Sequence, residues 1–512
     1  MSGRHSDPQR GLDATKKSPL FQGRFGRMFR AVPAATFGHT DEENHANLSE
    51  LAKAMSNSFD APKDGKDDEE SGIPALYTYF GQFIDHDITF DPVSTLRKAD
   101  DPDALTDFRT PTFDLDNVYG RGPDDQPYMY EADGKTFILG EKIGGGSPGA
   151  HDLQRNLLRA AEDKDHPARA LIGDPRNDEN SIVSQFQGLV QRFHNRTAQD
   201  HPHLTFAQLQ RHVRFHYQYL VLYDFLPRII HSSVIADLKT GNQYDPKKLK
   251  FFHWKDKPFM PVEFSVAAYR LGHSMIRPGY RLNDAVLLPI FPIVKHNLPE
   301  GLTGFRSMNP KWGIDWGRFI NIDVRKYDGD KAVTEKRLQF AYRIDTSLVN
   351  PLHDLPPSVA SKPASLPERN LLRGWRLGLP SGQAVARAMD LTLLADDEIM
   401  IGQGTVTPDP DLKPITAVSP VFKGNCPLWT YILAEAMRNQ EEVTIPVTEQ
   451  NIQIKTPRLG PVGGRVVLEV FLGLLAGDSD SLLGIHSHWQ PEKPKDGSKY
   501  ELKDFVKYAL GL

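Results

Sequence analysis

The chain has 512 residues, of which 39% are hydrophobic and 25% are charged, as is ordinary for a soluble globular protein. A net charge of −5 gives no reason to expect nucleic acid or an anionic membrane as a partner, and the single cysteine, Cys426, excludes an intrachain disulfide and cysteine-based metal sites. The N-terminus has no apolar signal segment, and no apolar run reaches the ~20 residues of a membrane span. We therefore expect a soluble protein, either cytoplasmic or secreted by another route.

Residues 1–70 are predicted to form an extended arm that packs on the body of the protein. The segment begins with a basic stretch and continues with Asn- and Asp-rich runs that have no clear periodicity. Its aromatic and sulfur-containing side chains, which include Phe25 and Phe29, would anchor it. Residues 71–512 are predicted to form one large domain, with Pro74 in the first turn of a helix.

The most informative stretch is YFGQFIDHDIT, at residues 79–89. On a helix, Gln82, Asp85 and His86 stand at i, i+3 and i+4 and share one face, whereas Asp87 is rotated by about 100° from His86. Burying an imidazole, a carboxylate and an amide among apolar residues costs several kcal/mol without partners. The stripe is therefore either a polar site or a solvated acidic face that carries an incidental histidine.

A second polar pattern follows at residues 110–120. Thr110, Thr112, Asp114 and Asp116 alternate, so their oxygens can converge on one side of an extended segment. Hard oxygen donors in a loop suit Ca²⁺, which takes roughly 6–8 ligands. An ordinary surface loop is the alternative.

The segment GDPRNDEN, at residues 173–180, precedes a stretch with apolar residues at helical spacing. Asp178 and Asn180 can be ordinary helix caps, but capping leaves Arg176 unexplained. Further on, His212 and His216 stand at i, i+4, a spacing compatible with metal ligation, although no third ligand is evident nearby. We interpret that region as helical core.

Residues 262–276 also have helical periodicity, with Val266, Tyr269, Arg270 and His273 on one face. A single histidine on such a face is usually a satisfied core residue. The remaining chain is predicted to form helices with Gly and Pro breaks, and β-type alternation is scarce. The expected fold is mainly α: one large helical domain with long loops and little β structure.

Taken in order, these segments resemble the signature of the animal-type haem peroxidases, in the peroxidase–cyclooxygenase superfamily, in a bacterial-like form without disulfides. The resemblance implies that haem b is the cofactor, that His86 is the acid–base residue and that Arg176 stabilises developing charge. It implies that His273 binds the haem iron and that Asn370, in a segment that departs from the family wording, orients His273. The remaining residues that it implies are Gln82, which would position water or a halide, and Arg270 and Arg373, which would lie close to the haem.

The resemblance also implies ester bonds from Asp85 and Glu179 to the haem, with unmodified carboxylates as the alternative. Asn180 stands where some relatives carry a haem-linked Met, so no thioether-type link is expected. The implied calcium ligands are the side chains of Asp87, Thr110, Asp114 and Asp116 and the backbone carbonyl of Thr112.

The implied activity is reduction of hydrogen peroxide with oxidation of small organic donors, and halides are further candidate donors. A fatty-acid dioxygenase of the same superfamily is one alternative. It requires a radical-forming Tyr three residues before the proximal His, but that position is Arg270, and Tyr269 lies four before. A haem- and calcium-binding module without turnover is the other alternative, although such a module has no need of a His86/Arg176 pair.

Overall fold

The computed structural model describes residues 23–90, 106–107, 111–156, 168–327, 336–357, 359–360, 362–404, 412–445, 451–485, 489–492, 494 and 496–512. Helices dominate this part of the chain. The longer α-helices are α1 (Asp41–Ala54), α2 (Leu76–Ile88), α4 (Ser181–Asp200), α5 (Phe206–Leu220), α8 (Leu366–Arg376), α11 (Leu428–Arg438), α12 (Pro461–Gly477) and α14 (Leu502–Leu510). The shorter ones are α3 (Asp116–Tyr119), α6 (Leu226–Ile229), α7 (Ser232–Asp237), α9 (Gly382–Ala388), α10 (Ile415–Val418) and α13 (Leu482–Ile485).

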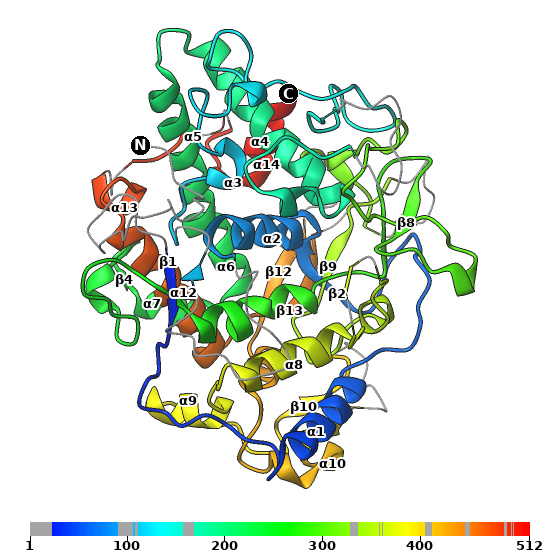
Figure 1. Ribbon diagram of the computed structural model, residues 1–512, viewed down its shortest axis with the longest axis vertical. Coiled ribbons are helices and arrows are strands. Elements are labelled where there is room, and N and C mark those ends of the chain that lie inside the picture. The colour runs from blue at the N-terminus through cyan, green and yellow to red at the C-terminus, as the bar shows by residue number, and fades with distance from the viewer. Residues whose placement is uncertain are drawn as a thin grey trace.

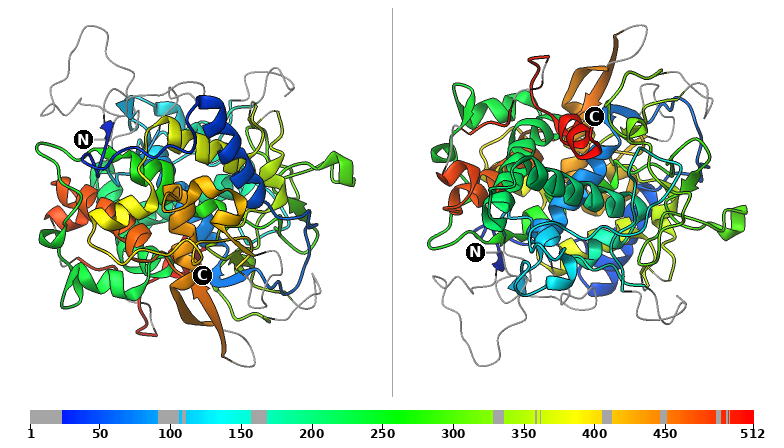
Figure 2. Two further views of the ribbon diagram at one scale, coloured as in Figure 1. Left: turned by 90° about the horizontal axis from the view of Figure 1, so that it is seen from below. Right: turned by 90° about the horizontal axis from the view of Figure 1, so that it is seen from above.

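The described strands are short and form sheets of only two or three strands. Their bounds are β1 (Gly23–Gly26), β2 (Glu70–Pro74), β3 (Thr106–Asp107), β4 (Lys239–Thr240), β5 (Gln243–Tyr244), β6 (Met260–Pro261), β7 (Gly279–Arg281), β8 (Leu287–Pro289), β9 (Phe340–Tyr342), β10 (Met400–Ile401), β11 (Lys413–Pro414), β12 (Gln440–Ile445) and β13 (Ile452–Pro457). The β12–β13 hairpin projects beyond the helical body (Figure 2). The prediction of a mainly helical fold with little β structure is confirmed.

Three segments far apart in sequence lie one below another in the middle of the molecule (Figure 1). They are α2, the green segment that contains residues 263–273, and α8. The start of α2 is fixed by neighbouring backbone: the amides of Ala75 and Leu76 donate to the carbonyls of Gln339 and Phe319, both at 2.9 Å. These bonds satisfy donors that a helix N-terminus leaves without intrahelical partners.

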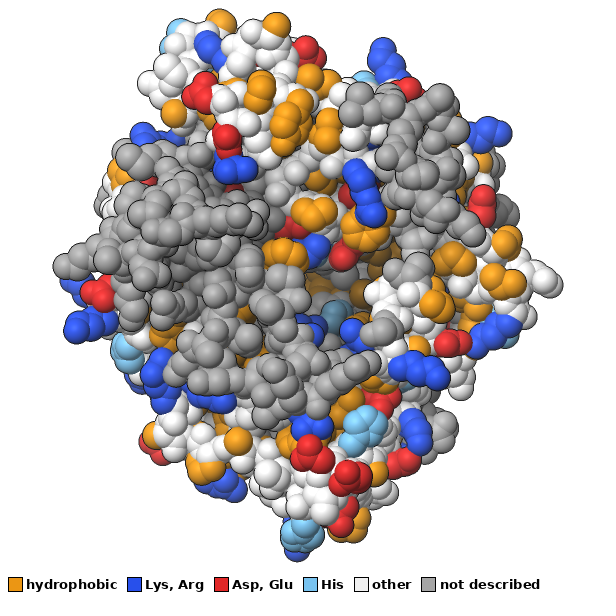
Figure 3. Space-filling view, in the orientation of Figure 1, with side chains coloured by type: hydrophobic (Ala, Val, Ile, Leu, Met, Phe, Trp, Pro, Cys, Tyr) orange, Lys and Arg blue, Asp and Glu red, His pale blue; other side chains and the backbone are white. Residues whose placement is uncertain are grey.

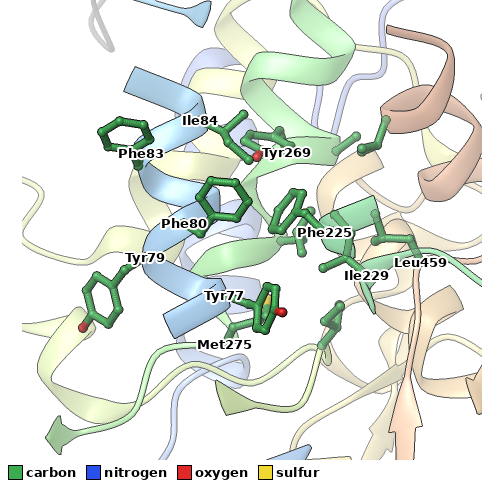
Figure 4. Close-up of a cluster of buried hydrophobic side chains, with 14 of the residues drawn as sticks. Tyr77, Tyr79, Phe80, Phe83, Ile84, Phe225, Ile229, Tyr269, Met275 and Leu459 are labelled. Carbon is green, nitrogen blue, oxygen red and sulfur yellow. The ribbon is translucent and has the colours of Figure 1, made fainter. Parts of the chain in front are cut away.

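One side of α2 packs into an aromatic cluster. The ring of Phe80 contacts those of Phe225 and Phe186 edge-to-face, at centroid distances of 5.6 and 5.8 Å, and Figure 4 shows Phe80 and Phe225 facing each other beside the helix. Such pairs contribute about 0.5–1.5 kcal/mol beyond their buried area. The rotation of α2 about its own axis is therefore tightly set.

The structure corrects two predictions about element boundaries. The arm is not extended throughout, because α1 lies within it: Thr40 caps the helix through the amide of Glu43, and Leu48 and Leu51 are fully buried. Pro74 ends strand β2 and does not open a helix, since α2 begins at Leu76.

A third difference concerns residues 263–273, called the proximal segment below, because they do not form an α-helix. This segment consists of a π-helical turn, Glu263–Ala267, followed by a 3₁₀ segment, Ala268–His273. Such turns are found frequently at functional sites. None of the described helices combines the length and apolarity needed to cross a lipid bilayer.

Described residues of the arm contact two segments that are distant in sequence. The backbone amides of Met28 and Phe29 each donate to the buried carboxylate of Glu263 at 3.0 Å, and Arg27 donates to the carbonyls of Leu377 and Gly378. The arm thus joins the start of the proximal segment to the end of α8.

We predict that Phe29→Ala lowers the free energy of unfolding by about 3 kcal/mol, because it leaves a cavity where a buried ring packs against Phe251. Chemical denaturation measures the change. Thr36→Ala, at an exposed position in the same arm, is the control and should leave the unfolding midpoint unchanged. An equal loss in both variants would contradict a specific anchoring role for Phe29.

Candidate active site

A cavity between α2 and the proximal segment brings together several of the polar residues singled out in the sequence. Its lining includes Gln82, Asp85 and His86 from α2, together with Glu179 and His273. The two imidazoles therefore face one space from different segments. In the space-filling view the middle of this face of the molecule is hollowed, with Lys or Arg and His side chains visible in the hollow (Figure 3).

The two faces of α2 differ as the helical spacing predicts. Gln82, Asp85 and His86 line the cavity, whereas Asp87 is fully buried and is not a lining residue. His86 is itself 4% exposed, and its Nδ1 lies 2.8 Å from Oδ1 of Asn177. Its Nε2 lies 3.5 Å from a carboxylate oxygen of Glu179.

Arg176 is held at the C-terminal end of α2. Its Nη2 donates to the carbonyls of His86 and Thr89 at 3.0 and 2.6 Å, and its guanidinium also binds the buried carboxylate of Asp174. Burial works to lower the pKa of Arg176, but Asp174, with Asp85 and Glu179, outweighs it and raises the pKa. Arg176 is not among the cavity-lining residues, but its charge interacts with two that are, Asp85 and Glu179.

Gln82 is fixed by two residues of the turn that precedes α4. Its amide nitrogen donates to Glu179, and its amide oxygen accepts from Nδ2 of Asn180 at 3.1 Å. Asn180 is also the N-cap of α4, because its Oδ1 accepts from the amides of Ile182 and Val183 at 3.1 and 2.9 Å. Asn180 thus connects the N-terminal cap of α4 to the cavity-lining residue Gln82.

His273 lies at the end of the 3₁₀ segment, with its Nδ1 2.8 Å from Nδ2 of Asn370 on α8. Oδ1 of Asn370 accepts from Nη1 of Arg270 at 3.1 Å. Burial, helped by the charge of Arg270, lowers the pKa of His273 to about 3, so the imidazole is neutral. Arg373, one turn beyond Asn370 on α8, is half-buried and is not a lining residue.

A second polar cluster lies on the other side of α2. Carboxylate oxygens of Asp87, Asp114 and Asp116 lie within 4.8 Å of one another, and all three residues are buried. Within the described residues neither oxygen of Asp87 has a well-formed hydrogen bond, although the Tyr217 hydroxyl and the Leu115 amide are near enough to oppose its pKa shift. Burial and the neighbouring carboxylates raise the pKa of Asp87 and of Asp114 well above their usual range.

The loop that carries Asp114 and Asp116 is shaped by local contacts. Thr112 Oγ1 donates to Asp114 at 2.9 Å, and the amide of Asp116 donates to the same carboxylate at 3.1 Å. Leu115 between them has a φ of +60°, a conformation that costs a non-glycine residue energy and is kept where surrounding structure imposes it. Thr110 lies outside the described residues.

His212 and His216 contribute to aromatic packing. Nδ1 of His216 contacts the carbonyl of His212 at 2.9 Å, and its ring packs on Trp489 at 4.9 Å. Burial, with a smaller effect of His212, lowers the pKa of His216 to about 3.

Comparison with known proteins finds similarity over part of the chain. Residues 98–296 match the family model described as animal haem peroxidase. The chain is also 29% identical over 221 residues to the dual oxidase of Drosophila melanogaster, a match that covers 41% of this chain and 13% of the dual oxidase.

This central part of the chain is therefore similar to animal haem peroxidase domains.

Solved structures are similar to this chain in fold. Peroxidase A from Dictyostelium discoideum superposes with a TM-score of 0.59 at 15% identity, covering 96% of this chain and 93% of that one. The fatty acid alpha-dioxygenase of Arabidopsis thaliana superposes with a TM-score of 0.51 at 15% identity, covering 93% of this chain and 76% of that one. At 15% identity, these two likenesses show the fold alone.

Sequence reasoning missed several residues of this site. Asn177, which contacts His86, occupies a position that the family pattern leaves variable, and nothing in its spacing marks it. Tyr77 and Tyr79 line the cavity as well, but among apolar neighbours in the sequence they are indistinguishable from core residues. Only the folded contacts reveal them.

Asn180 gives a stability prediction. Asn180→Ala removes the N-cap of α4 and should destabilise the protein by about 1 kcal/mol, whereas Asn180→Ser keeps a capping oxygen and should recover most of that loss. Equilibrium denaturation compares the two variants. Equal destabilisation by Ala and Ser would show that the cap is not the stabilising contact.

Proposed function

We propose that this protein is a haem-dependent peroxidase that reduces hydrogen peroxide and oxidises small organic donors, with halides as further donors. The observation that carries the proposal is that His86 and His273, which are far apart in the chain, line the same cavity. An acid–base imidazole facing a neutral, metal-competent imidazole is the pair that peroxide chemistry at a haem requires.

The cavity residues fit a haem. His273 would bind the iron through Nε2, since its low pKa leaves the ring neutral and able to ligate. The neighbouring residue Gly272 also lines the cavity, and a Cβ placed on it would meet no atom within 4 Å. There is therefore open space beside His273. Asp85 and Glu179 are cavity carboxylates that would hold the haem, through ester bonds or as free carboxylates.

Ligation imposes a condition on Asn370. An imidazole that binds metal through Nε2 carries its proton on Nδ1 and needs an acceptor there. Because the orientation of an amide is assigned from its hydrogen bonds, Asn370 would have to turn its oxygen toward His273, and Arg270 would then donate elsewhere. Arg270 and Arg373 remain the residues proposed to lie close to the haem.

The chain's own residues would move the protons and stabilise the charge. When bound, the haem would supply the two electrons that reduce the O–O bond of peroxide, and the donor would later return them. Nε2 of His86 would take a proton from one peroxide oxygen and return it to the departing one, and the charge of Arg176 would stabilise the negative charge that develops. Gln82, held by Glu179 and Asn180, would orient water or a halide beside them.

We further propose that Asp87, Asp114 and Asp116, with the carbonyl of Thr112 and with Thr110, bind Ca²⁺. Three buried carboxylates this close together are unfavourable unless they are protonated or share a cation, and their oxygens are the donors that Ca²⁺ prefers. Because Asp87 follows His86 directly, a cation there would fix the rotation of α2 and thereby the direction of the His86 ring.

A fatty-acid dioxygenase is the second candidate, and one observation favours it. Although Tyr269 is not at the expected sequence position, it lines the cavity, and its hydroxyl donates to the carbonyl of Gly81 at 3.2 Å. A tyrosyl radical at Tyr269 would therefore arise within the same space as His273.

The decisive experiment is a guaiacol assay with hydrogen peroxide on haem-loaded protein. His86→Leu should lower the rate about 10²–10⁴-fold while the haem content stays the same, because acid–base catalysis contributes that much. His39→Leu, at an exposed histidine, is the matched control and should keep full activity.

Oxygen uptake with a fatty acid is measured beside the guaiacol assay and should stay at background. Fatty-acid-dependent uptake that Tyr269→Phe abolishes, without guaiacol oxidation, would replace the peroxidase proposal with the dioxygenase one.

Asp87→Ala tests the calcium site. We expect lower haem incorporation and lower peroxidase activity together, and loss of the increase in melting temperature that added Ca²⁺ gives the unmodified protein. Asp124→Ala, which removes an exposed carboxylate, should change none of these. Full activity of Asp87→Ala in the presence of a calcium chelator would refute the coupling between the site and His86.

A further inference from the structure

His86 has a buried neighbour that no part of the proposed chemistry has used. Its Nδ1 lies 2.8 Å from Oδ1 of Asn177, and Nδ2 of Asn177 donates to Oε1 of Gln187 at 2.9 Å. Asn177 and Gln187 are both fully buried, and Gln187 belongs to α4. The side-chain amides of Asn177 and Gln187 thus form a hydrogen-bonded chain, called the relay below, that extends from Nδ1 of His86 into the protein interior.

We propose that Asn177 is a positioning residue for His86. By accepting a hydrogen bond from Nδ1, Asn177 fixes the tautomer with its proton on Nδ1 and leaves the lone pair of Nε2 directed at the cavity. This inference rests on the proposed peroxidase function, in which Nε2 is the atom that accepts the proton of the peroxide.

The contacts on the outer edge of the ring favour this tautomer. If both amides were turned over, Asn177 would donate to Nδ1, and the ring proton would sit on Nε2. The nearest carboxylate oxygen, on Glu179, is 3.5 Å from Nε2, which is beyond the 2.7–3.2 Å of a normal N–H···O bond. A proton on Nε2 would therefore lack a good acceptor, whereas a proton on Nδ1 has one at 2.8 Å.

The backbone holds Asn177 in place for this role. It lies in the 3₁₀ turn Pro175–Asp178, its amide donates to the carbonyl of Asp174 at 3.1 Å, and the next residue, Asp178, binds Arg155 through two hydrogen bonds of 2.8 Å. Because these hydrogen bonds hold the backbone at Asn177, its carboxamide sets the orientation of the His86 ring.

Two substitutions at Asn177 distinguish a role as hydrogen-bond acceptor from a role in filling space. Asn177→Leu keeps a similar size but removes the acceptor, whereas Asn177→Asp keeps an acceptor and cannot donate. Cyanide is the probe: hydrogen cyanide gives up a proton as it binds ferric haem, so its association rate reports the distal base without turnover.

We expect Asn177→Leu to lower the cyanide association rate constant and kcat/KM for peroxide about 10–100-fold, the usual effect of losing an orienting partner. Asn177→Asp should stay close to the unmodified protein, with equal haem content in all variants. Ser184→Ala is the control. Ser184 is buried on α4, the helix of Gln187, and its hydroxyl donates to Asp178 at 3.4 Å, but it does not contact Asn177 or Gln187 through a hydrogen bond.

The proposal is overturned if Asn177→Asp loses as much as Asn177→Leu, since Asn177 would then act as a donor, or if Asn177→Leu binds cyanide at the unmodified rate. Should Asn177→Leu fail to fold, Gln187→Glu and Gln187→Leu repeat the comparison one step away: the first keeps an acceptor for Asn177, and only the second should slow cyanide binding. An unmodified protein that neither binds cyanide quickly nor reduces peroxide would instead refute the proposed function.

Discussion

The site depends on one contact between a cation and the end of a helix. The last carbonyls of α2 have no intrahelical donors, and Arg176 supplies hydrogen bonds to two of them, at His86 and Thr89. Asp174 binds the same guanidinium, so the charge is paired in a region where an unpaired one would be costly. This contact, together with those of Asn177, Glu179 and Asn180, holds the turn 174–180 against α2.

That turn carries most of the polar machinery in seven residues. Arg176 reaches the end of α2, Asn177 contacts His86, Glu179 faces the cavity and Asn180 starts α4. Asp178 points the other way, into a buried ion pair with Arg155 that Asp152 completes. A buried ion pair is weak evidence for stability, but it favours one arrangement over others, which is what a turn with several separately aimed side chains needs.

The helical pattern of α2 could be predicted from sequence because it depends only on spacing. The shared face of Gln82, Asp85 and His86, and the separate direction of Asp87, follow from 100° per residue. The proximal segment could not be predicted in this way, because a π turn followed by a 3₁₀ turn changes the angular step twice within eleven residues, 263–273. Tyr269 and His273, four positions apart in this segment, both line the cavity.

The contacts that aim side chains were also beyond sequence reasoning, since they join residues without a periodic relation. Asn177 and Gln187 belong to different elements, and their significance appears only when the ring of His86 lies between the relay and the cavity. The same holds for Asp87, whose burial makes sense only beside the loop of Asp114 and Asp116. Because His86 and Asp87 are consecutive on a rigid helix, turning one toward its partners turns the other as well. The rotation of α2 therefore sets both the direction of His86 toward the cavity and that of Asp87 toward the carboxylate cluster. A change that loosens the contacts on one side of the helix should also alter the contacts on the other.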